Sequence, residues 1–162
     1  LGDKFALRGY TRLGYGNDLP FYKNYFAGGY GSVRGYRNNT LGPRSITVDA
    51  LDTLTGTQSF ADQEPIGGNA LVQGGMELVL PLPFKGDWTK QIRPVLFAEG
   101  GQVFDTTVNN FKMRYDDYRF SAGFGFTWIT VIGPLSLSYA YPFNSKDGDE
   151  TKRIQFEIGR LF

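Results

Sequence analysis

The fold is decided by one stretch of sequence, Phe120-Ser121-Ala122-Gly123-Phe124-Gly125-Phe126-Thr127-Trp128. Its residues alternate without a break, with aromatic rings and Ala on one face and Ser, Gly and Thr on the other. A period of two residues is that of a β-strand. The run Leu135 to Tyr141 alternates in the same way after Gly133 and Pro134, so the two runs predict a hairpin with Gly and Pro in its turn.

Four more segments outside this hairpin alternate as well. The C-terminal run, from Arg153 to Phe162, places only Arg160 on its apolar face. Earlier in the chain, residues 5–15, 69–80 and about 93–104 read as strands, although Pro94 fits a strand only near one end. The sequence therefore predicts an all-β fold of six antiparallel strands in up-and-down order.

The composition excludes several kinds of site. The 162 residues include no Cys and no His, so a zinc site, a disulfide framework, a thiol nucleophile and a Ser-His triad cannot be built. Seventeen basic and sixteen acidic residues give a net charge of +1, which provides no general basic field for nucleic acid. Aromatic residues make up 16% and hydrophobic residues only 41%, a balance that is unusual for a soluble helical protein.

A transmembrane β-barrel accounts for this balance. No stretch approaches the roughly 20 apolar residues of a transmembrane helix, whereas a barrel strand needs only about 9–11 alternating residues. A soluble β-sandwich also alternates, but residues 16–68 form a loop of about fifty residues without strand periodicity, and outer-membrane barrels concentrate such length on one side. Aromatic residues also gather toward strand ends, as in interfacial girdles: Tyr10, Tyr15, Trp128, Tyr139, Tyr141, Phe143 and Phe162.

The strand count predicts a barrel larger than this chain. Six strands are fewer than the roughly eight of the smallest single-chain barrels, and an open sheet in a membrane leaves two edges unpaired. Together with a start inside a strand at Leu1, this predicts that residues 1–162 form the C-terminal part of a transmembrane β-barrel. By itself, such a part is expected to self-associate through its unpaired edges.

The long loop carries the motifs of a known family. It reads Phe21-Tyr22-Lys23-Asn24-Tyr25-Phe26-Ala27-Gly28-Gly29 and then Val33-Arg34-Gly35-Tyr36. It resembles the outer-membrane assembly superfamily of β-barrel proteins, in which a VRG(F/Y) motif lies at the tip of a long loop folded into the barrel lumen. Further motifs follow in the family's order, including Gly67-Gly68-Asn69-Ala70, Phe97-Ala98-Glu99-Gly100-Gly101 and Tyr139-Ala140-Tyr141-Pro142-Phe143. The resemblance covers nearly the whole chain.

Charges on the loop and on two strands suggest an ion-pair site. Glu77 and Glu99 fall on the polar sides of neighbouring predicted strands, and Arg34 is offered by a Gly-flanked loop. A guanidinium pairs well with two carboxylates, and a lone charge in a confined lumen is costly. The resemblance implies this lock of the loop; the alternative is that both carboxylates are solvated in a wet lumen. The family's strand motif is F-x-D-x-G, and its positions are occupied here by Phe97, Glu99 and Gly101.

The last strand resembles the β-signal of outer-membrane barrels, an amphipathic strand that ends in an aromatic residue. Its apolar face holds Phe156, Ile158 and finally Phe162. The plain alternative is an ordinary last strand whose terminal ring anchors at the membrane interface. The family implies that this strand meets the first strand of the barrel at a weak seam, a lateral gate where client strands enter. Gly159, which has no side chain to pack, is expected to weaken or kink the strand there.

The resemblance implies a function without enzymatic activity, namely an insertase that folds client β-barrels into the bacterial outer membrane. The partners that it implies are outer-membrane lipids, unfolded β-barrel clients, and lipoprotein subunits bound through periplasmic domains outside this chain. No cofactor, metal or nucleic acid is expected. Two alternatives stay open: a translocation pore of a related two-partner secretion or autotransporter assembly system, and a passive small barrel.

Three other sites are weaker hypotheses. The run Gly28-Gly29-Tyr30-Gly31 is Gly-rich, but a phosphate-binding loop needs a strand before it, a helix after it and normally a Lys, and no helix is expected after this run. Asp147, Asp149 and Glu150 suggest calcium, although residues 144–149 fit a hairpin loop better. A hydrolase built on the two strand glutamates would need unequal environments for its acid and its base, and the sequence supplies none.

Overall fold

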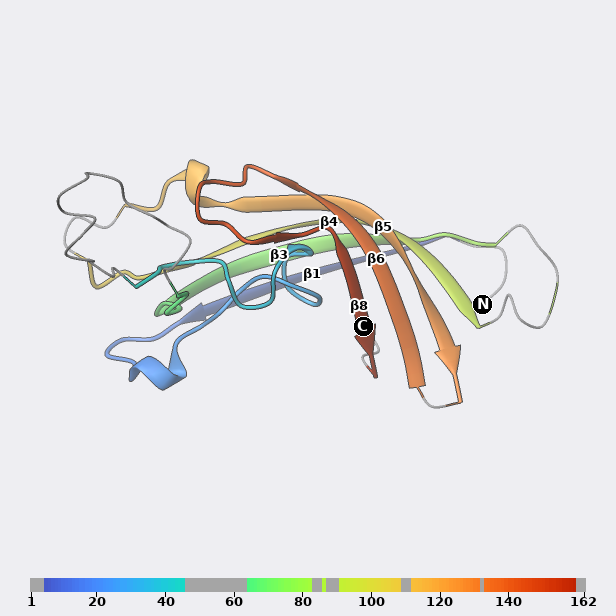
Figure 1. Ribbon diagram of the computed structural model, residues 1–162, viewed down its shortest axis with the longest axis horizontal. Helices are drawn as coiled ribbons and strands as arrows, with labels where there is room; N and C mark the ends of the chain where they lie inside the picture. The colour runs from blue at the N-terminus through green and yellow to red at the C-terminus, as the bar shows by residue number, and fades with distance from the viewer. Residues whose placement is uncertain are drawn as a thin grey trace, which may run out of the picture.

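One antiparallel sheet organises the chain. The computed structural model describes residues 5–45, 64–82, 86, 91–108, 112–131 and 133–159. Within them, six strands lie side by side in the order β1-β3-β4-β5-β6-β8 (Figure 1). Their bounds are Ala6–Tyr15 for β1, Ala70–Val79 for β3, Ile92–Phe104 for β4, Arg119–Thr130 for β5, Gly133–Phe143 for β6 and Ile154–Ile158 for β8. The predicted all-β, antiparallel, up-and-down arrangement is confirmed.

The strand ends differ from the sequence prediction in two places. Gly133 and Pro134, expected in the hairpin turn, belong to β6 and pair with the last two residues of β5. β8 ends at Ile158, because Gly159 has a φ of 82° and leaves the extended region of backbone conformation. Pro94 is the third residue of β4, near its start, where a missing N–H is tolerated.

The two faces of the sheet differ in polarity. One face, called the inner face here, presents buried polar side chains: Gln73, Glu77, Glu99, Ser121, Thr127, Ser136, Ser138 and Gln155. The opposite face, called the open face, exposes large apolar side chains from every strand: Leu7, Leu13, Tyr15, Met76, Leu96, Phe124, Phe126, Trp128, Leu137, Tyr139, Tyr141, Phe143, Ile154, Phe156 and Ile158. Across the described ranges, no helix has the length and apolar character needed to cross a membrane.

The long segment between β1 and β3 folds back over the inner face. Its described residues run from blue to cyan in Figure 1, where the cyan part is drawn across the ribbons of β1 and β3. They include the 3-10 helix η1 (Phe21–Lys23) and the two-residue strand β2 (Gly35–Tyr36), which pairs with β7 (Thr151–Lys152). A second 3-10 turn, η4 (Tyr115–Asp117), precedes β5. The sequence prediction missed β2 and β7, because a strand of two residues has no measurable period.

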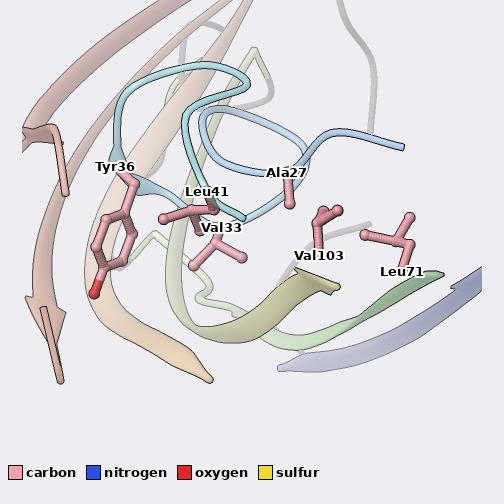
Figure 2. Packing of buried hydrophobic residues seen from close by; sticks show 6 residues of the cluster. All are labelled: Ala27, Val33, Tyr36, Leu41, Leu71 and Val103. Atoms are coloured by element: carbon pink, nitrogen blue, oxygen red, sulfur yellow. The ribbon is translucent and has the colours of Figure 1, made fainter. Parts of the chain in front are cut away.

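A small apolar cluster attaches the loop to the sheet. Ala27, Val33, Tyr36 and Leu41 of the loop pack with Leu71 of β3 and Val103 of β4 (Figure 2). The four loop side chains are at most 1% exposed. Burial of apolar surface favours this packing, at about 25 cal/mol for each Å² removed from water. The cluster therefore holds the motif residues 33–36 against the inner face.

Candidate functional site

Arg34 is the charged centre of the loop. Its Nη2 donates to Glu77 Oε1 of β3 and to Glu99 Oε1 of β4, both at 2.5 Å. Its backbone N–H donates to Glu99 Oε2 at 2.8 Å. The three residues are only 2%, 5% and 4% exposed, respectively. One loop residue is thus bound, through both side chain and backbone, to two neighbouring strands.

The register of β3 and β4 brings the two carboxylates together. Glu77 lies opposite Phe97, and Glu99 lies opposite Gly75. All four share the inner face, because residues two apart in a strand point the same way. Gly75 leaves room for the carboxylate, since a Cβ there would come 2.8 Å from Glu99 Cγ. The ring of Phe97 lies against the guanidinium, with Arg34 Cζ 3.5 Å from the ring centroid, a cation–π contact.

Gly101, the last residue of the strand motif, allows close packing beside this site. A Cβ at Gly101 would lie 2.7 Å from Gln73 Cβ on β3. Gln73 Oε1 accepts a hydrogen bond from Ser32 Oγ of the loop at 2.9 Å, and Ser32 Oγ accepts one from Gly28 N–H at 3.1 Å. The motif glycine therefore adjoins a second polar contact between the loop and β3, which the sequence prediction did not include.

The formal charges of Arg34 and its two partners do not cancel. One guanidinium faces two carboxylates, and Arg8 of β1 lies opposite Glu77 in the β1–β3 register. Burial by itself lowers the pKa of the Arg34 guanidinium, but the hydrogen bond and charge of Glu99 and the charge of Glu77 outweigh burial, and the pKa is raised. Arg34 is therefore a permanent cation.

Tyr10 belongs to this site and not to an interfacial girdle, so that prediction is wrong. Its Oη lies 2.9 Å from Ser32 O and 3.3 Å from Glu99 Oε1, and its proton can be donated to either. The sequence contained a signal for this position, since Tyr10 lies two residues from both Arg8 and Arg12 and therefore shares their polar face of the strand. The other predicted girdle residues that are described lie exposed on the open face: Tyr15, Trp128, Tyr139, Tyr141 and Phe143.

A second contact region begins at Tyr36, the last residue of the loop motif. Tyr36 is fully buried, and its hydroxyl donates to Phe143 O at 2.6 Å. Gln155 of β8 donates from Nε2 to Tyr36 O at 2.6 Å. Arg37 donates from its backbone N–H to Glu150 O at 2.8 Å and from Nη1 to Glu150 Oε2 at 2.6 Å. The loop is therefore also bound to the last strand and to the chain before it, which the sequence prediction missed.

The acidic loop before β7 has cationic side chains as its partners. Asp149 forms a largely buried ion pair with Arg119 Nε and accepts a hydrogen bond from Lys146 N–H at 2.8 Å. Glu150 pairs with Arg37. Two of the three carboxylates that suggested calcium in the sequence, Asp149 and Glu150, therefore connect residues 146–150 to the start of β5 and to the long loop.

The predicted gate residues lie at the edge of the sheet. Phe156 and Ile158 are exposed on the open face of β8, opposite to the face that Arg34 contacts. Gly159 follows, and its N–H donates to Pro134 O at 2.9 Å. Phe162 lies outside the described residues. Within the described sheet β8 pairs on one side only, with β6.

Known proteins match this chain along its whole length. The Omp85 superfamily domain matches residues 2–162. The chain is 32% identical over its full length to outer membrane protein assembly factor BamA of Neisseria meningitidis serogroup B, of which it covers 21%. It matches the crystal structure of Haemophilus ducreyi BamA lacking POTRA domains 1–3 with a TM-score of 0.74 and 32% identity, over 94% of this chain and 31% of that one. Sorting and assembly machinery component 50 homolog of Xenopus tropicalis is 26% identical over 85% of the chain.

The chain spans less than a third of the length of these relatives, with 21%, 28% and 31% covered. The resemblance to the outer-membrane assembly superfamily that the motifs predicted is confirmed, and within that superfamily the chain is similar to BamA. So is the prediction that the strands form part of a β-barrel of the BamA type. The roles of the individual loop and strand residues stay predictions.

Proposed function

Because the chain belongs to the Omp85 superfamily, we propose that it is part of a barrel that folds other β-barrel proteins and inserts them into the outer membrane. Its location is the bacterial outer membrane, as for the relatives named outer membrane protein assembly factors. The observation that carries the proposed activity is the edge strand β8. It pairs with β6 over five residues, and within the described sheet it has no neighbour on its other side.

A short edge strand can serve as a template for an incoming strand. On its free side, β8 offers backbone N–H and C=O groups to a new strand, and β-augmentation uses such groups. Phe156 and Ile158 point to the open face, so a client strand beside β8 would place its own apolar side chains in the same lipid layer. Gly159, which follows β8, has a positive φ and leaves the extended backbone conformation there. These features fit a lateral gate at β8.

The contact of Arg34 with Glu77 and Glu99 keeps the loop inside the barrel in this proposal. Loss of the guanidinium would leave two buried carboxylates beside each other without the cation that both of them contact. Removing one partner of a buried ion pair is strongly destabilising for this reason. Loop placement therefore depends on Arg34, and the proposed gate strand β8 belongs to the same sheet to which Arg34 attaches the loop.

The proposal includes the partners of the barrel. Lipids cover the open face, unfolded barrel proteins are the clients, and lipoprotein subunits bind periplasmic domains outside this chain. Isolated residues 1–162 are proposed to self-associate through the edges of β1 and β8. Light scattering of the isolated chain should detect oligomers, and a monodisperse monomer would contradict this part of the proposal.

Client folding in vesicles tests the proposed activity. The full-length protein is reconstituted in phosphatidylethanolamine and phosphatidylglycerol vesicles, and folding of an added unfolded outer-membrane barrel is followed. Arg34→Ala is expected to slow client folding by about tenfold or more and to open the loop to protease. Arg114→Ala removes a guanidinium from an exposed pair with Asp116 and should fold clients at the original rate. Normal folding with a protected loop in Arg34→Ala would contradict the role of the lock.

Substrate range separates the insertase from a translocation pore. Depletion of the protein in cells should reduce the assembly of many outer-membrane barrels at once. Loss of a single secreted protein, with barrel assembly intact, would favour the pore. Conductance without any client folding in the reconstituted vesicles would favour a passive barrel.

A further inference from the structure

The chain that enters β8 joins the sheet only part of the way along β6. β6 and β8 pair over five residues, whereas β5 and β6 pair over eleven. One further hydrogen bond continues the register, from Ala140 N–H to Arg153 O at 2.8 Å. The two residues before Arg153 form β7, which pairs with β2 of the long loop instead of with β6. The chain just before the last strand is therefore held by the loop.

The register shows where β7 would lie if it stayed beside β6. Its continuation places Lys152 opposite Tyr141 and Thr151 opposite Pro142. In an antiparallel pair, the backbone groups of residues two apart point to the same neighbouring strand, so the backbone of Pro142 is directed to the same side as that of Ala140, which bonds to Arg153. Pro142, however, has no N–H to donate. Only the Thr151 N–H could form a bond at this pair, to Pro142 O. The end of β6 is thus a weaker partner for β7 than an ordinary strand, but it is still a partner.

The loop supplies its own partners for the same segment. Gly35 lies opposite Lys152 and Tyr36 opposite Thr151. Gln155, on the inner face of β8, donates to Tyr36 O at 2.6 Å and is only 4% exposed. Its Oε1 is buried without a partner among the described residues. The bond to the loop is therefore the hydrogen bond that compensates the burial of the Gln155 amide.

We propose that Thr151 and Lys152 exchange between two partners, β2 of the loop and the end of β6, and that Gln155 is the positioning residue that favours the loop. With the loop docked, β7 stays on β2 and the β6–β8 pairing is short. With the loop withdrawn, β7 joins β6, and β8 extends toward Thr151. The loop thereby sets the length of the edge that a client strand meets, a last step that rests on the proposed function.

The exchange links the Arg34 contact to the edge strand. Only Gly35 separates Arg34 from Tyr36, so the loop cannot leave Glu77 and Glu99 without straining its pairing with β7. A change at β3 and β4 is in this way transmitted to β8, on the far side of β5 and β6 in the sheet order.

Disulfide trapping measures the exchange directly. Residues 1–162 contain no cysteine, so an introduced pair is easily read in a full-length background without other cysteines. Tyr141→Cys with Lys152→Cys reports the extended register, in which the two residues form a non-hydrogen-bonded pair with Cβ atoms about 4.5–5.5 Å apart, close enough for a small adjustment to form the bond. Slow disulfide formation is expected in the parent. Adding Gln155→Leu should raise its rate by about tenfold, because the loop loses a buried hydrogen bond.

The matched control is Ser138→Ala. Ser138 lies opposite Gln155 in the β6–β8 register, and its buried hydroxyl has no partner among the described residues. This substitution should leave the rate of disulfide formation unchanged. If Gln155→Leu fails to fold, as judged by heat-modifiable mobility, Arg37→Ala takes its place and should raise the rate by roughly two- to threefold. Equal rates in the parent and in the folded loop-contact variant would overturn the exchange.

A second pair separates this inference from the proposed function. Arg37→Cys with Glu150→Cys ties β7 to the loop, and its disulfide should lower the client folding rate, with recovery on reduction. If Gln155→Leu raises the rate of the first disulfide but the second disulfide leaves client folding unchanged, the exchange is retained and its role in assembly is rejected. If client folding depends on Arg34 but the rate of disulfide formation is unchanged by Gln155→Leu, the proposed function is retained and the exchange is rejected.

Discussion

The inner and the open face of the sheet are built from the same strands, but their side chains differ in polarity and in exposure. On β4 and its neighbour β3, Glu99 and Glu77 are 4% and 5% exposed, although both are charged. On the open face, Phe124 and Phe156 are 59% and 58% exposed, although both are apolar. A water-soluble protein shows the opposite distribution, because charged groups are rarely buried and large apolar patches are rarely exposed.

The difference teaches that each face needs its own covering. The inner face is covered by the loop, which supplies a cation for its carboxylates and hydrogen bonds for its amides, since buried polar groups without partners are costly. The open face needs no partner groups and suits the hydrocarbon of a membrane. Alternation along each strand assigns every residue to one of these two environments.

The largest effect is expected from the inner face. Glu99→Ala removes the carboxylate that binds both the side chain and the backbone N–H of Arg34. It should lower the unfolding free energy of the protein in vesicles by about 3–5 kcal/mol, measured by urea titration. Glu157→Ala, at a half-buried position of β8, is the comparison variant and should cost much less. Equal losses of unfolding free energy for the two substitutions would mean that the buried ion pair contributes no more to stability than a half-buried side chain of β8.

A charge on the open face tests its environment. Phe124→Arg places a guanidinium near the middle of β5 on the open face and should cost about 2–4 kcal/mol in a bilayer. Phe124→Leu keeps the position apolar and is the control. Stability that is unaffected by the arginine would show that this face does not contact hydrocarbon, and the contrast between the faces would fail.

Two glycines with similar backbone conformations separate crowding from backbone strain. Gly35 has a φ of 92°, and a Cβ there would lie 3.2 Å from Ala140 Cβ; Gly159 has a φ of 82° and nothing within 4 Å of a Cβ. Both alanine substitutions carry a backbone cost of about 1–2 kcal/mol. Only Gly35→Ala adds crowding, so it should lower the stability more. A Gly159→Ala variant with unchanged stability and client folding would contradict a role for Gly159 at the seam.

The neutral contact at Tyr36 should be weaker than the charged contact at Arg34. Tyr36→Phe removes the hydrogen bond to Phe143 O and should cost about 0.5–1.5 kcal/mol by the same urea titration. Tyr22→Phe, at a side chain that is 71% exposed, should leave the stability unchanged. A loss as large as that of Glu99→Ala would place the main anchor of the loop at Tyr36 instead.

The smallest effect is expected at the rim, where water reaches the loop. Arg37 pairs with Glu150 through side chains that are 68% and 38% exposed. Arg37→Ala should cost about 0.2–1 kcal/mol, and the difference should vanish at high salt because exposed charges are screened. The loss in Glu99→Ala should persist in the same salt series, since that pair is buried. A salt response shared by both variants would indicate that water reaches the inner face.

Period-two alternation was sufficient to predict the six long strands, because each strand is exposed to two different environments along its length. The ends of the strands are harder to predict from the sequence. Gly133 and Pro134 are residue types that favour turns, but pairing with β5 retains them in β6. Tyr10 was placed with the interfacial aromatics by residue type, whereas its position on the polar side of β1 directs it to Glu99.

The sequence predicted the ion pairs of Arg34 with Glu77 and Glu99, but not the other contacts that hold the loop. Opposite charges on a Gly-flanked loop and on two strands suggested a pair, and the family motif supplied the positions. Ser32, Gln73, Gln155 and Glu150 add further contacts of the loop, and they carry no local pattern that marks them. Tyr10 adds another, and its place on the polar face of β1 is the pattern that marks it. Their partners lie far along the chain, as with Gln155 and Tyr36, so only the folded arrangement brings them together.

The sequence by itself determined the strands, the polarity of each face and the family, because these depend on residue type and on spacing within a few residues. The tertiary structure decided what the loop binds. Arg34 meets two carboxylates because the register of β3 and β4 places Glu77 and Glu99 on one face, two positions apart. β7, just before β8, pairs with β2 of the loop, and Gln155 of β8 donates to the carbonyl of Tyr36. Such contacts depend on register, which is a property of paired strands and not of either strand alone.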